Sequence, residues 1–366
     1  MKELLEKTNK KTLILIGGFL ILICIIIFGG ALLYNKLFYK TSYPEIENIM
    51  KNATIEYLRD RKDKLPQNIN ESITITEETL VSTEKMKSIN ELIKNNDISC
   101  DGQVIVTNIN GNYRYNPIIN CEDEYETIKF VDYINKNINI TETENGLHKS
   151  GNDLVFKGEN VNNYLQFSNK MYRIVKITNN YTVLILTEKL DNVAWDNRYN
   201  IDKDSKTGIN NYTVSRIQDY LTALYKGNTL ITQEDKLLVA SHNVPIGKRN
   251  TNESDKSGAI ENSTILEDQY ISLLPTYDFL NASLDKNCTT TIAESCSNYN
   301  YLAQYNLNWW TATANNKNTH QVYRINGSIK LTQASNTAYV RPVIYLNNDA
   351  IYVSGNGTKE NPYKVK

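Results

Sequence analysis

The chain has 366 residues, of which 40 are Lys or Arg and 41 are Asp or Glu, so its formal net charge is −1. This balance, without any block of basic residues, excludes the basic patch that is typical of nucleic-acid-binding proteins. No nucleic-acid partner is therefore expected, and outside one apolar segment near its start the chain is polar.

The apolar segment is Thr12–Leu33, an uncharged run of 22 residues. A helix rises about 1.5 Å per residue, so this run is long enough to cross the roughly 30 Å hydrocarbon layer of a bilayer. We therefore predict a transmembrane signal-anchor at residues 12–34. The four lysines of residues 1–11 favour a cytoplasmic tail, because positive charge is retained on the cytoplasmic side. The predicted localisation is the cell membrane, as a single-pass protein with the bulk of the chain extracytoplasmic.

Two alternatives remain open for this segment. Gly29 and Ala31 have the spacing of small residues before a signal-peptide cleavage site, although the run is longer than an h-region of about 7–15 residues. A type IV pilin is cleaved after Gly and has Glu five residues into the mature helix. Gly18 fits that cleavage site, but the fifth residue is Ile23, so the usual contact for pilin assembly is missing. Cys24 is interpreted as a small apolar residue that faces lipid.

A helix is predicted at Ser42–Lys64, where apolar residues recur at steps of three and four. Pro44 lies in its first turn, where the missing N–H costs nothing, and Pro66 follows its end. We interpret residues 35–66 as a stalk helix whose apolar stripe must be covered, either by the next segment or by a partner helix. The second possibility would mean oligomerisation through the stalk. The stripe consists of Ile46, Ile49, Met50, Ala53, Tyr57 and Leu58.

Residues 67–150 are predicted to form a small α+β module. Ser88–Lys94 has the pattern of a short helix, with the serine as its N-cap. Gly102–Asn120 contains two alternating segments about an Asn110-Gly111 turn, which indicates a β-hairpin. Residues 135–153 are rich in Asn, Thr, Glu and Gly, and we expect them to form a linker.

Four of the five cysteines lie outside the apolar segment. They form two local pairs, Cys100 with Cys121 and Cys288 with Cys296, which fits two disulfides in an oxidising compartment. Four free thiols are the alternative. Neither spacing matches a zinc ribbon, and no histidine lies near either pair.

Residues 151–366 are predicted to form one α+β domain of short antiparallel strands and long loops, long enough for a substantial core. We expect a helix at Thr213–Tyr225, with Thr213 as its cap and Gly227 at its end. The polar residues 247–263 are expected to be a mobile loop. The predicted strands are Lys170–Ile177, Tyr181–Thr187, Gln321–Ile325, Gly327–Leu331 and Val340–Leu346.

The same region contains a series of characteristic blocks. They are Leu154-Val-Phe-Lys-Gly, Asn162-Asn-Tyr-Leu-Gln-Phe, Met171-Tyr-Arg-Ile-Val-Lys-Ile, Ser215-Arg-Ile, Ile271-Ser-Leu-Leu-Pro-Thr-Tyr-Asp-Phe, Trp309-Trp-Thr-Ala-Thr, Val340-Arg-Pro-Val-Ile-Tyr-Leu and Ser354-Gly-Asn-Gly-Thr-Lys-Glu-Asn-Pro-Tyr. In order and number they resemble a widespread exported domain of low-GC Gram-positive bacteria, a family of unknown function. The match covers about residues 153–366. The family usually has Trp where Tyr172 stands, which points to a packing role that another aromatic residue can fill. The segment from Cys100 to Cys121 also resembles a module that precedes such domains.

The family is similar in pattern to the C-type-lectin-like fold of the formylglycine-generating-enzyme class, so the resemblance implies this fold for residues 151–366. It brings no catalytic residues. Formylglycine-generating enzymes use a redox-active cysteine pair, whereas Cys288 and Cys296 flank a polar loop and are interpreted as a structural disulfide. The Glu-Pro-Asn, Gln-Pro-Asp and Trp-Asn-Asp motifs of calcium-dependent lectins are absent. We therefore expect no cofactor, no metal site and no catalytic residue.

Two further patterns have residue types that occur in metal or catalytic sites. Asn200, Asp202 and Asp204 follow the start of an EF-hand loop, but Ser205 stands where that loop needs Gly and Asn211 where it needs Glu. A solvated acidic loop is the preferred interpretation. The three histidines, His148, His242 and His320, are scattered along the chain. Ser241 precedes one of them, but sequence adjacency does not make a catalytic dyad.

Trp309 and Trp310 are the sharpest candidates for binding, because exposed aromatic rings stack on sugars and anchor interfaces. Adjacent strand residues point to opposite faces, so at least one of the two is expected in the core, and core or framework roles are preferred to binding. Arg341 precedes a proline in an apolar strand. We interpret it as a buried structural arginine with a carboxylate or carbonyl partner.

These patterns favour a membrane-anchored extracytoplasmic protein that binds protein or glycan at the cell surface, with adhesion as its role. The prediction rests on the absence of any catalytic set and on the resemblance in fold, which is an analogy. The alternative is a structural subunit of a pilin-like surface assembly. An enzyme is the least favoured class.

Overall fold

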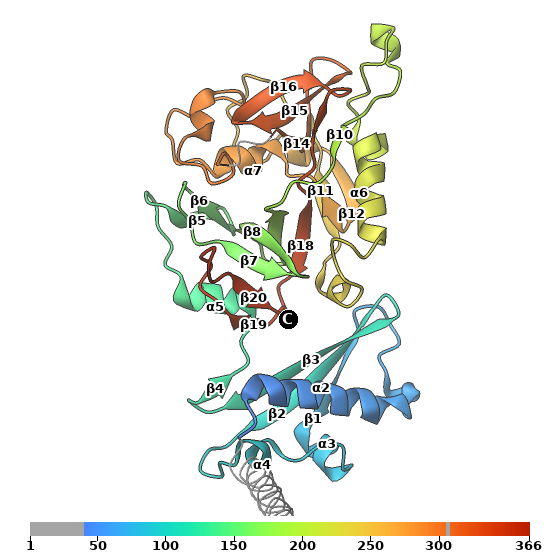
Figure 1. Ribbon diagram of the computed structural model, residues 1–366, viewed down its shortest axis with the longest axis vertical. Coiled ribbons are helices and arrows are strands. Elements are labelled where there is room, and N and C mark those ends of the chain that lie inside the picture. The colour runs from blue at the N-terminus through green and yellow to red at the C-terminus, as the bar shows by residue number, and fades with distance from the viewer. Residues whose placement is uncertain (1–39, 305–307) are drawn as a thin grey trace, which may run out of the picture. The chain divides into compact units, whose positions relative to one another are not determined.

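The computed structural model describes residues 40–304 and 308–366 (Figure 1). Its fold is mixed α+β, with many strands and few helices. The predicted tail and signal-anchor, residues 1–11 and 12–34, lie outside the described residues. Within the described ranges, no helix is both long enough and apolar enough to cross a bilayer. The chain divides into two compact units, Met1–Glu126 and Thr127–Lys366.

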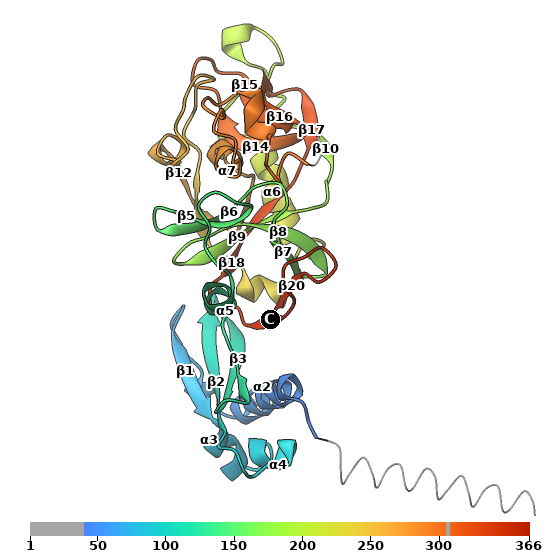
Figure 2. The same cartoon turned by 90° about the vertical axis from the view of Figure 1, so that its left-hand side faces the viewer.

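The first unit is a four-stranded antiparallel sheet in the order β1-β2-β3-β4. One helix, α2, covers a face of this sheet, while two short helices lie near one end of its strands (Figure 2). The elements are α2 (Tyr43–Arg59), β1 (Ser72–Thr76), α3 (Glu77–Ser82), α4 (Ile89–Ile93), β2 (Asp101–Ile109), β3 (Asn112–Cys121) and β4 (Tyr125–Glu126).

Helix α2 lies within the segment predicted to be a stalk helix, and its apolar stripe is covered by the segment that follows it, the first of the two predicted possibilities. Ile46 and Met50 are completely buried, and they share a core with Val104 of β2 and Ile119 of β3. The helix also ends at Arg59, before the predicted end. Its apolar stripe is therefore covered within the unit, which removes the argument for a partner helix.

The predicted hairpin is confirmed as β2 and β3, each slightly longer than expected. Asn110 and Gly111 at its turn have φ angles of 52° and 85°. This pair of left-handed residues is what a two-residue type I′ turn requires, and it explains the Asn-Gly sequence. A disulfide between Cys100 and Cys121 joins the open ends of the hairpin, as the cysteine spacing predicts.

The second unit contains most of the strands. Its helices are α5 (Phe130–Asn137), α6 (Arg216–Lys226) and α7 (Thr276–Asn281), besides short 3-10 turns. Its strands are β5 (Gly146–Ser150), β6 (Asp153–Lys157), β7 (Tyr164–Phe167), β8 (Lys170–Ile177), β9 (Tyr181–Leu186), β10 (Asn192–Ala194), β11 (His242–Pro245), β12 (Ile265–Gln269), β13 (Ile271–Ser272), β14 (Trp309–Ala314), β15 (Gln321–Asn326), β16 (Ser328–Gln333), β17 (Thr337–Tyr339), β18 (Val343–Asn347), β19 (Tyr352–Ser354) and β20 (Tyr363–Val365).

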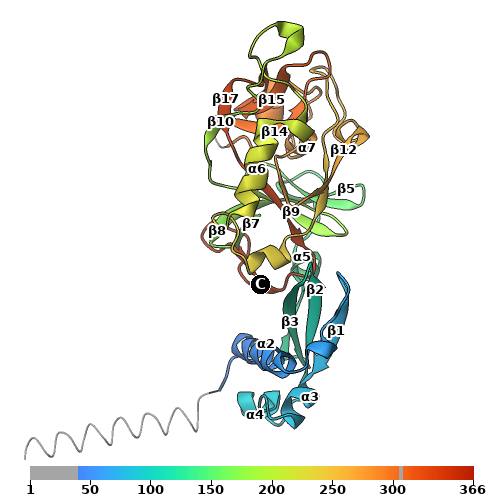
Figure 3. The same cartoon turned by 90° about the vertical axis from the view of Figure 1, so that its right-hand side faces the viewer.

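Two sheets of this unit share one hydrophobic core. One sheet has the order β10-β17-β14-β15-β16, and the other has the order β13-β18-β9-β8-β7-β20-β19, with β6 joined to it through β8. Strands β11 and β12 form a separate two-stranded ribbon. Helix α6 lies beside β10 (Figure 3). It also packs against β13, which belongs to the other sheet, and so connects the two sheets.

The boundary between the units lies at Glu126, earlier than the predicted boundary at residue 150. The predicted linker at residues 135–153 is wrong, because the end of α5, strand β5 and the start of β6 occupy it. Phe130, Ile134 and Leu147 are almost fully buried in the core of the second unit. The segment is predicted to be a linker because most of its residues are polar, although these few apolar residues anchor it in the core.

Most of the other predicted helix caps and strands are confirmed, with small shifts of their bounds. Ser88 caps α4 as predicted, its Oγ accepting a hydrogen bond from the backbone of the N3 residue. The N-cap of α6 is Ser215 and not Thr213, because Tyr212–Val214 forms a separate 3-10 turn. Gly227 ends α6 as expected. Strands β8, β9, β15 and β16 confirm predicted strands, and β18 begins later than expected.

Candidate functional site

The second unit contains an open polar cleft of about 750 Å³. Its lining comes from the β5–β6 turn, the end of β8, the start of β9, the β11–β12 ribbon and α7. This volume lies within the roughly 300–1,000 Å³ range of small-molecule sites, but such sites are usually mostly apolar. Here seven of the lining residues are asparagines, so the walls are dominated by hydrogen-bonding groups.

The most buried part of the cleft is an ion pair between Lys176 on β8 and Asp278 on α7. The Lys176 Nζ lies 2.9 Å from the Asp278 Oδ1 and donates a second hydrogen bond to the Tyr277 hydroxyl at 2.7 Å. The lysine side chain is 12 % exposed and the aspartate side chain 3 %. Strand β8 has an irregular register just before Lys176, and such irregularities redirect side chains.

Burial alone would lower the pKa of Lys176, but the Asp278 carboxylate and the Tyr277 hydroxyl outweigh it, so this pKa lies above its ordinary value. Burial raises the pKa of Asp278, and the lysine ammonium opposes that shift. The pair is therefore a tightly coupled, mutually compensated unit. It offers no free cation to a ligand and no deprotonated amine for nucleophilic chemistry.

His242, at the start of β11, lines the wall of the same cleft. Its ring lies against Tyr181 and Tyr345, with centroid distances of 4.5 Å and 4.0 Å. Burial, with the Lys176 charge as a smaller cause, lowers the pKa of His242 to about 3. The imidazole is therefore neutral at physiological pH. The neighbouring Ser241 Oγ donates to Asp268, at 3.2 Å, so it is not paired with this ring.

One wall of the cleft belongs to residues 247–263, and the prediction that this segment is a mobile loop is wrong. Arg249 and Glu261 are both fully buried and their side chains form an ion pair of 2.9 Å. The arginine Nε also donates to the Thr291 Oγ1, at 2.8 Å, and an Nη to the Asp255 carbonyl oxygen. The other Glu261 oxygen accepts from the Tyr277 backbone N–H at 3.2 Å, which fixes the segment to α7.

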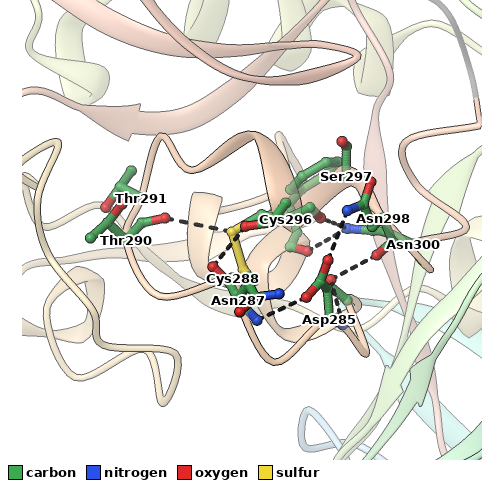
Figure 4. The surroundings of a disulfide bond; sticks show 12 residues. Asp285, Asn287, Cys288, Thr290, Thr291, Cys296, Ser297, Asn298 and Asn300 are labelled. Atoms are coloured by element: carbon green, nitrogen blue, oxygen red, sulfur yellow. Dashed lines mark hydrogen bonds between the residues drawn. A yellow bond between two sulfur atoms is a disulfide. The ribbon is translucent and has the colours of Figure 1, made fainter.

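The second predicted disulfide, Cys288–Cys296, lies in the loop that follows α7 along the chain (Figure 4). Both cysteines are buried, and the Cys296 Sγ approaches the Thr290 carbonyl oxygen at 3.5 Å. The Asn300 Nδ2 donates to the carbonyl oxygens of Cys296 and Phe279, both at 2.9 Å. The disulfide loop thus supports the helix that carries Tyr277 and Asp278. Two disulfides are typical of proteins from oxidising, extracellular compartments.

Trp309 and Trp310, the predicted binding candidates, are both completely buried. The Trp310 Nε1 donates to the Val193 carbonyl oxygen at 2.8 Å, and neither ring is available to a sugar or a partner surface. The guanidinium of Arg341 lies 4.9 Å from the Trp309 ring centre, and its Nε donates to the Leu186 carbonyl oxygen at 3.0 Å. The interpretation of Arg341 as a buried structural residue with a carbonyl partner is confirmed.

The acidic EF-hand-like segment and the two remaining histidines lie apart from the cleft. The Asn200 Nδ2 donates to the Gly208 carbonyl oxygen at 2.8 Å, which makes the asparagine a structural turn residue. The His148 Nε2 contacts the Glu144 carbonyl oxygen at 2.8 Å, and His320 is mostly buried elsewhere. Among the described residues, no group of three His, Cys, Asp or Glu side chains is placed to hold a metal ion.

Sequence reasoning missed Lys176, Tyr277 and Asp278, although a signal was present. Lys176 interrupts the apolar strand around it, and Asp278 lies between two aromatic residues. A charged residue that is buried with an apolar block needs a partner, because an unpaired buried charge is costly. The two charges are 102 residues apart, so only the fold could pair them.

Searches among protein families, curated proteins and solved structures found no match to this chain.

Proposed function

We propose that the chain is a membrane-anchored extracytoplasmic binding protein that recognises protein or glycan at the cell surface. The apolar run at residues 12–34 is the proposed anchor, and the two disulfides support an extracytoplasmic location. The observation that carries the proposal is the polar cleft of the second unit, with the Lys176–Asp278 pair at its most buried part. Binding at this cleft is the proposed basis of adhesion.

For the second unit we propose membership of the exported Gram-positive family whose blocks it resembles, and a C-type-lectin-like fold. Its short, mostly antiparallel strands, joined by long loops, support this assignment. Support also comes from Tyr172, which is completely buried on β8, as expected for an aromatic residue that replaces a packing Trp. The first unit corresponds in this proposal to the disulfide-containing module that precedes such domains.

A binding role is preferred to an enzymatic one because of the chemistry in the cleft. His242 is neutral and lies against the rings of Tyr181 and Tyr345, the Ser241 hydroxyl donates to Asp268, and the Lys176 ammonium is paired. None of these groups is arranged as an activated nucleophile with an adjacent base. The pilin-like alternative loses the argument from the stalk helix, because the apolar stripe of α2 is covered within the first unit.

The proposal is tested by probing an array of glycans and surface proteins with the purified full-length chain and two tryptophan variants. Ser241→Trp places a large ring in the cleft, and Thr229→Trp places one on a distant exposed position. We expect binding by the wild type and by Thr229→Trp, and its loss in Ser241→Trp. A blank array for the wild type, together with turnover of a substrate, would contradict the proposal.

A further inference from the structure

We infer that the ligand of the cleft is a carbohydrate without acidic groups. This inference rests on the binding role proposed above and narrows it from protein or glycan to one class of ligand. Three properties of the lining carry it, namely the balance of charge, the hydrogen-bonding groups at the rim and the shortage of apolar surface.

The charge of the lining disfavours an anionic ligand. Within the described chain, Lys176 is the one lysine or arginine that lines the cleft, and Asp278 already compensates its charge. Asp153 and Asp268 add two carboxylates without an ion-pair partner among the described residues, and His242 is neutral. A carboxylate, sulfate or phosphate group on the ligand would meet uncompensated negative charge. Neutral sugars and amino sugars avoid this repulsion, and an amine would be attracted.

The rim of the cleft suits hydroxyl groups. Asn152, Asn179 and Asn180 are exposed lining residues whose side-chain amides make no hydrogen bond within the described chain. Each amide can donate two hydrogen bonds and accept at its oxygen, and a sugar hydroxyl both donates and accepts. An apolar ligand would strip water from these amides without replacing its hydrogen bonds, which is costly. A hydroxyl-rich ligand replaces them one for one.

The cleft has little apolar surface on which the side chains of a peptide could pack. The aliphatic lining residues are Val155, Ala240, Pro245 and Ile265, which come from different elements. Protein interfaces instead depend on a central apolar or aromatic anchor in a pocket. The half-buried Tyr181, in edge contact with His242, supplies one aromatic surface for the C–H face of a sugar ring. This combination of one aromatic surface with many amides favours carbohydrate over peptide.

The test uses the full-length chain and immobilised oligosaccharides of three kinds: neutral, amino-bearing and acidic, with defined peptides as a fourth arm. The double variant Asn179→Ala/Asn180→Ala removes two rim amides. Thr178, and not either asparagine, accepts the side-chain hydrogen bonds of this turn, so the turn should be retained. The matched control is Asn192→Ala/Asn316→Ala, two exposed asparagines of the same unit that do not line the cleft.

We expect binding to neutral or amino-bearing oligosaccharides, weakened on the order of tenfold in the rim variant and unchanged in the control. Binding only to acidic sugars or only to peptides would overturn this inference while leaving the binding role intact. Sugar binding that the rim variant does not weaken would also overturn it, because the ligand would then lie elsewhere. No binding in any arm would overturn the binding role itself.

Discussion

The carboxylate of Glu261 joins two segments of the second unit, because one of its oxygens pairs with the Arg249 guanidinium at 2.9 Å and neither side chain is exposed. Its other oxygen accepts the backbone N–H of Tyr277. The wall of the cleft and the helix beside it are thus held by one buried charge pair. The stability of the second unit should depend on both partners.

Arg249→Leu should lower the free energy of unfolding of the second unit by about 3–5 kcal/mol, because Glu261 is left as an uncompensated buried charge. The exposed pair Arg216–Asp219 provides the control, since its side chains are 60 % and 68 % exposed. Arg216→Leu should change stability by about 0.5 kcal/mol or less. The measurement is urea unfolding followed by tryptophan fluorescence, which reports this unit alone because Trp195, Trp309 and Trp310 are the three tryptophans of the chain. Equal effects of the two variants would contradict the assigned role.

The two disulfides should stabilise different units. Replacing Cys100 and Cys121 by Ser opens a loop with a sequence separation of 21 and should cost about 3 kcal/mol in the first unit. Replacing Cys288 and Cys296 opens a separation of 8 and should cost about 2.5 kcal/mol in the second. Only the second variant should shift the tryptophan transition, while far-UV circular dichroism should detect both. The intact mass should also lie about 4 Da below that of the reduced chain, and an unchanged mass would refute both bonds.

Substitutions on helix α2 test whether its apolar stripe is buried within the first unit. Met50 is completely buried, so Met50→Ala should cost about 2–5 kcal/mol in the first unit. Ile55 lies on the same helix and is 40 % exposed, so Ile55→Ala should cost about 0.5 kcal/mol or less. Circular dichroism during urea unfolding gives both values, with the tryptophan transition unchanged as an internal control. A large effect at Ile55 that depends on protein concentration would instead indicate a partner helix.

His242 should make the second unit less stable in mild acid. The pKa of His242 is lowered to about 3 in the folded chain, against about 6.5 when unfolded, so between these values the unfolded state holds the extra proton. The stabilising contribution is therefore complete above pH 6.5 and is lost as the pH falls. Between pH 7 and pH 5 the loss should be about 2 kcal/mol.

His242→Phe retains a ring between Tyr181 and Tyr345 but cannot take up a proton. On going from pH 7 to pH 5, the wild type should therefore lose about 2 kcal/mol more unfolding free energy than this variant. Asn243→Ala, at the neighbouring exposed position, should follow the wild-type pH profile. Parallel profiles for wild type and His242→Phe would show that the imidazole is not protected from protonation.

Local patterns allowed much of the secondary structure to be predicted. The spacing of Ile46, Met50 and Tyr57 predicts α2, and Asn110-Gly111 predicts the hairpin turn, because each signal lies within a few residues. The same signals do not specify what a helix packs against. The apolar face of α2 is consistent with a stalk or with a domain helix, and only the sheet beneath it decides between them.

The cleft could not be predicted because it is assembled from distant segments. Lys176 and Asp278 are 102 residues apart, and pairing them requires the packing of α7 beside β8. The 247–263 segment is misleading for another reason. Its composition is polar, as in mobile loops, but one fully buried arginine, Arg249, is enough to fix its conformation. Composition averages over a segment, whereas anchoring depends on single residues.

The pairing of β20 with β7 has a consequence for biosynthesis. These strands are parallel neighbours although Tyr363 and Leu165 are separated by nearly the whole second unit. The strand pairings of the described part of the first unit join residues at most 35 apart, as in Ser72 with Thr107, so this unit can fold before the second unit is complete. The second unit cannot complete its larger sheet until residues 363–365 are available, so it should fold late and as a whole. A stalled or truncated chain would present a finished first unit joined to an open, aggregation-prone sheet.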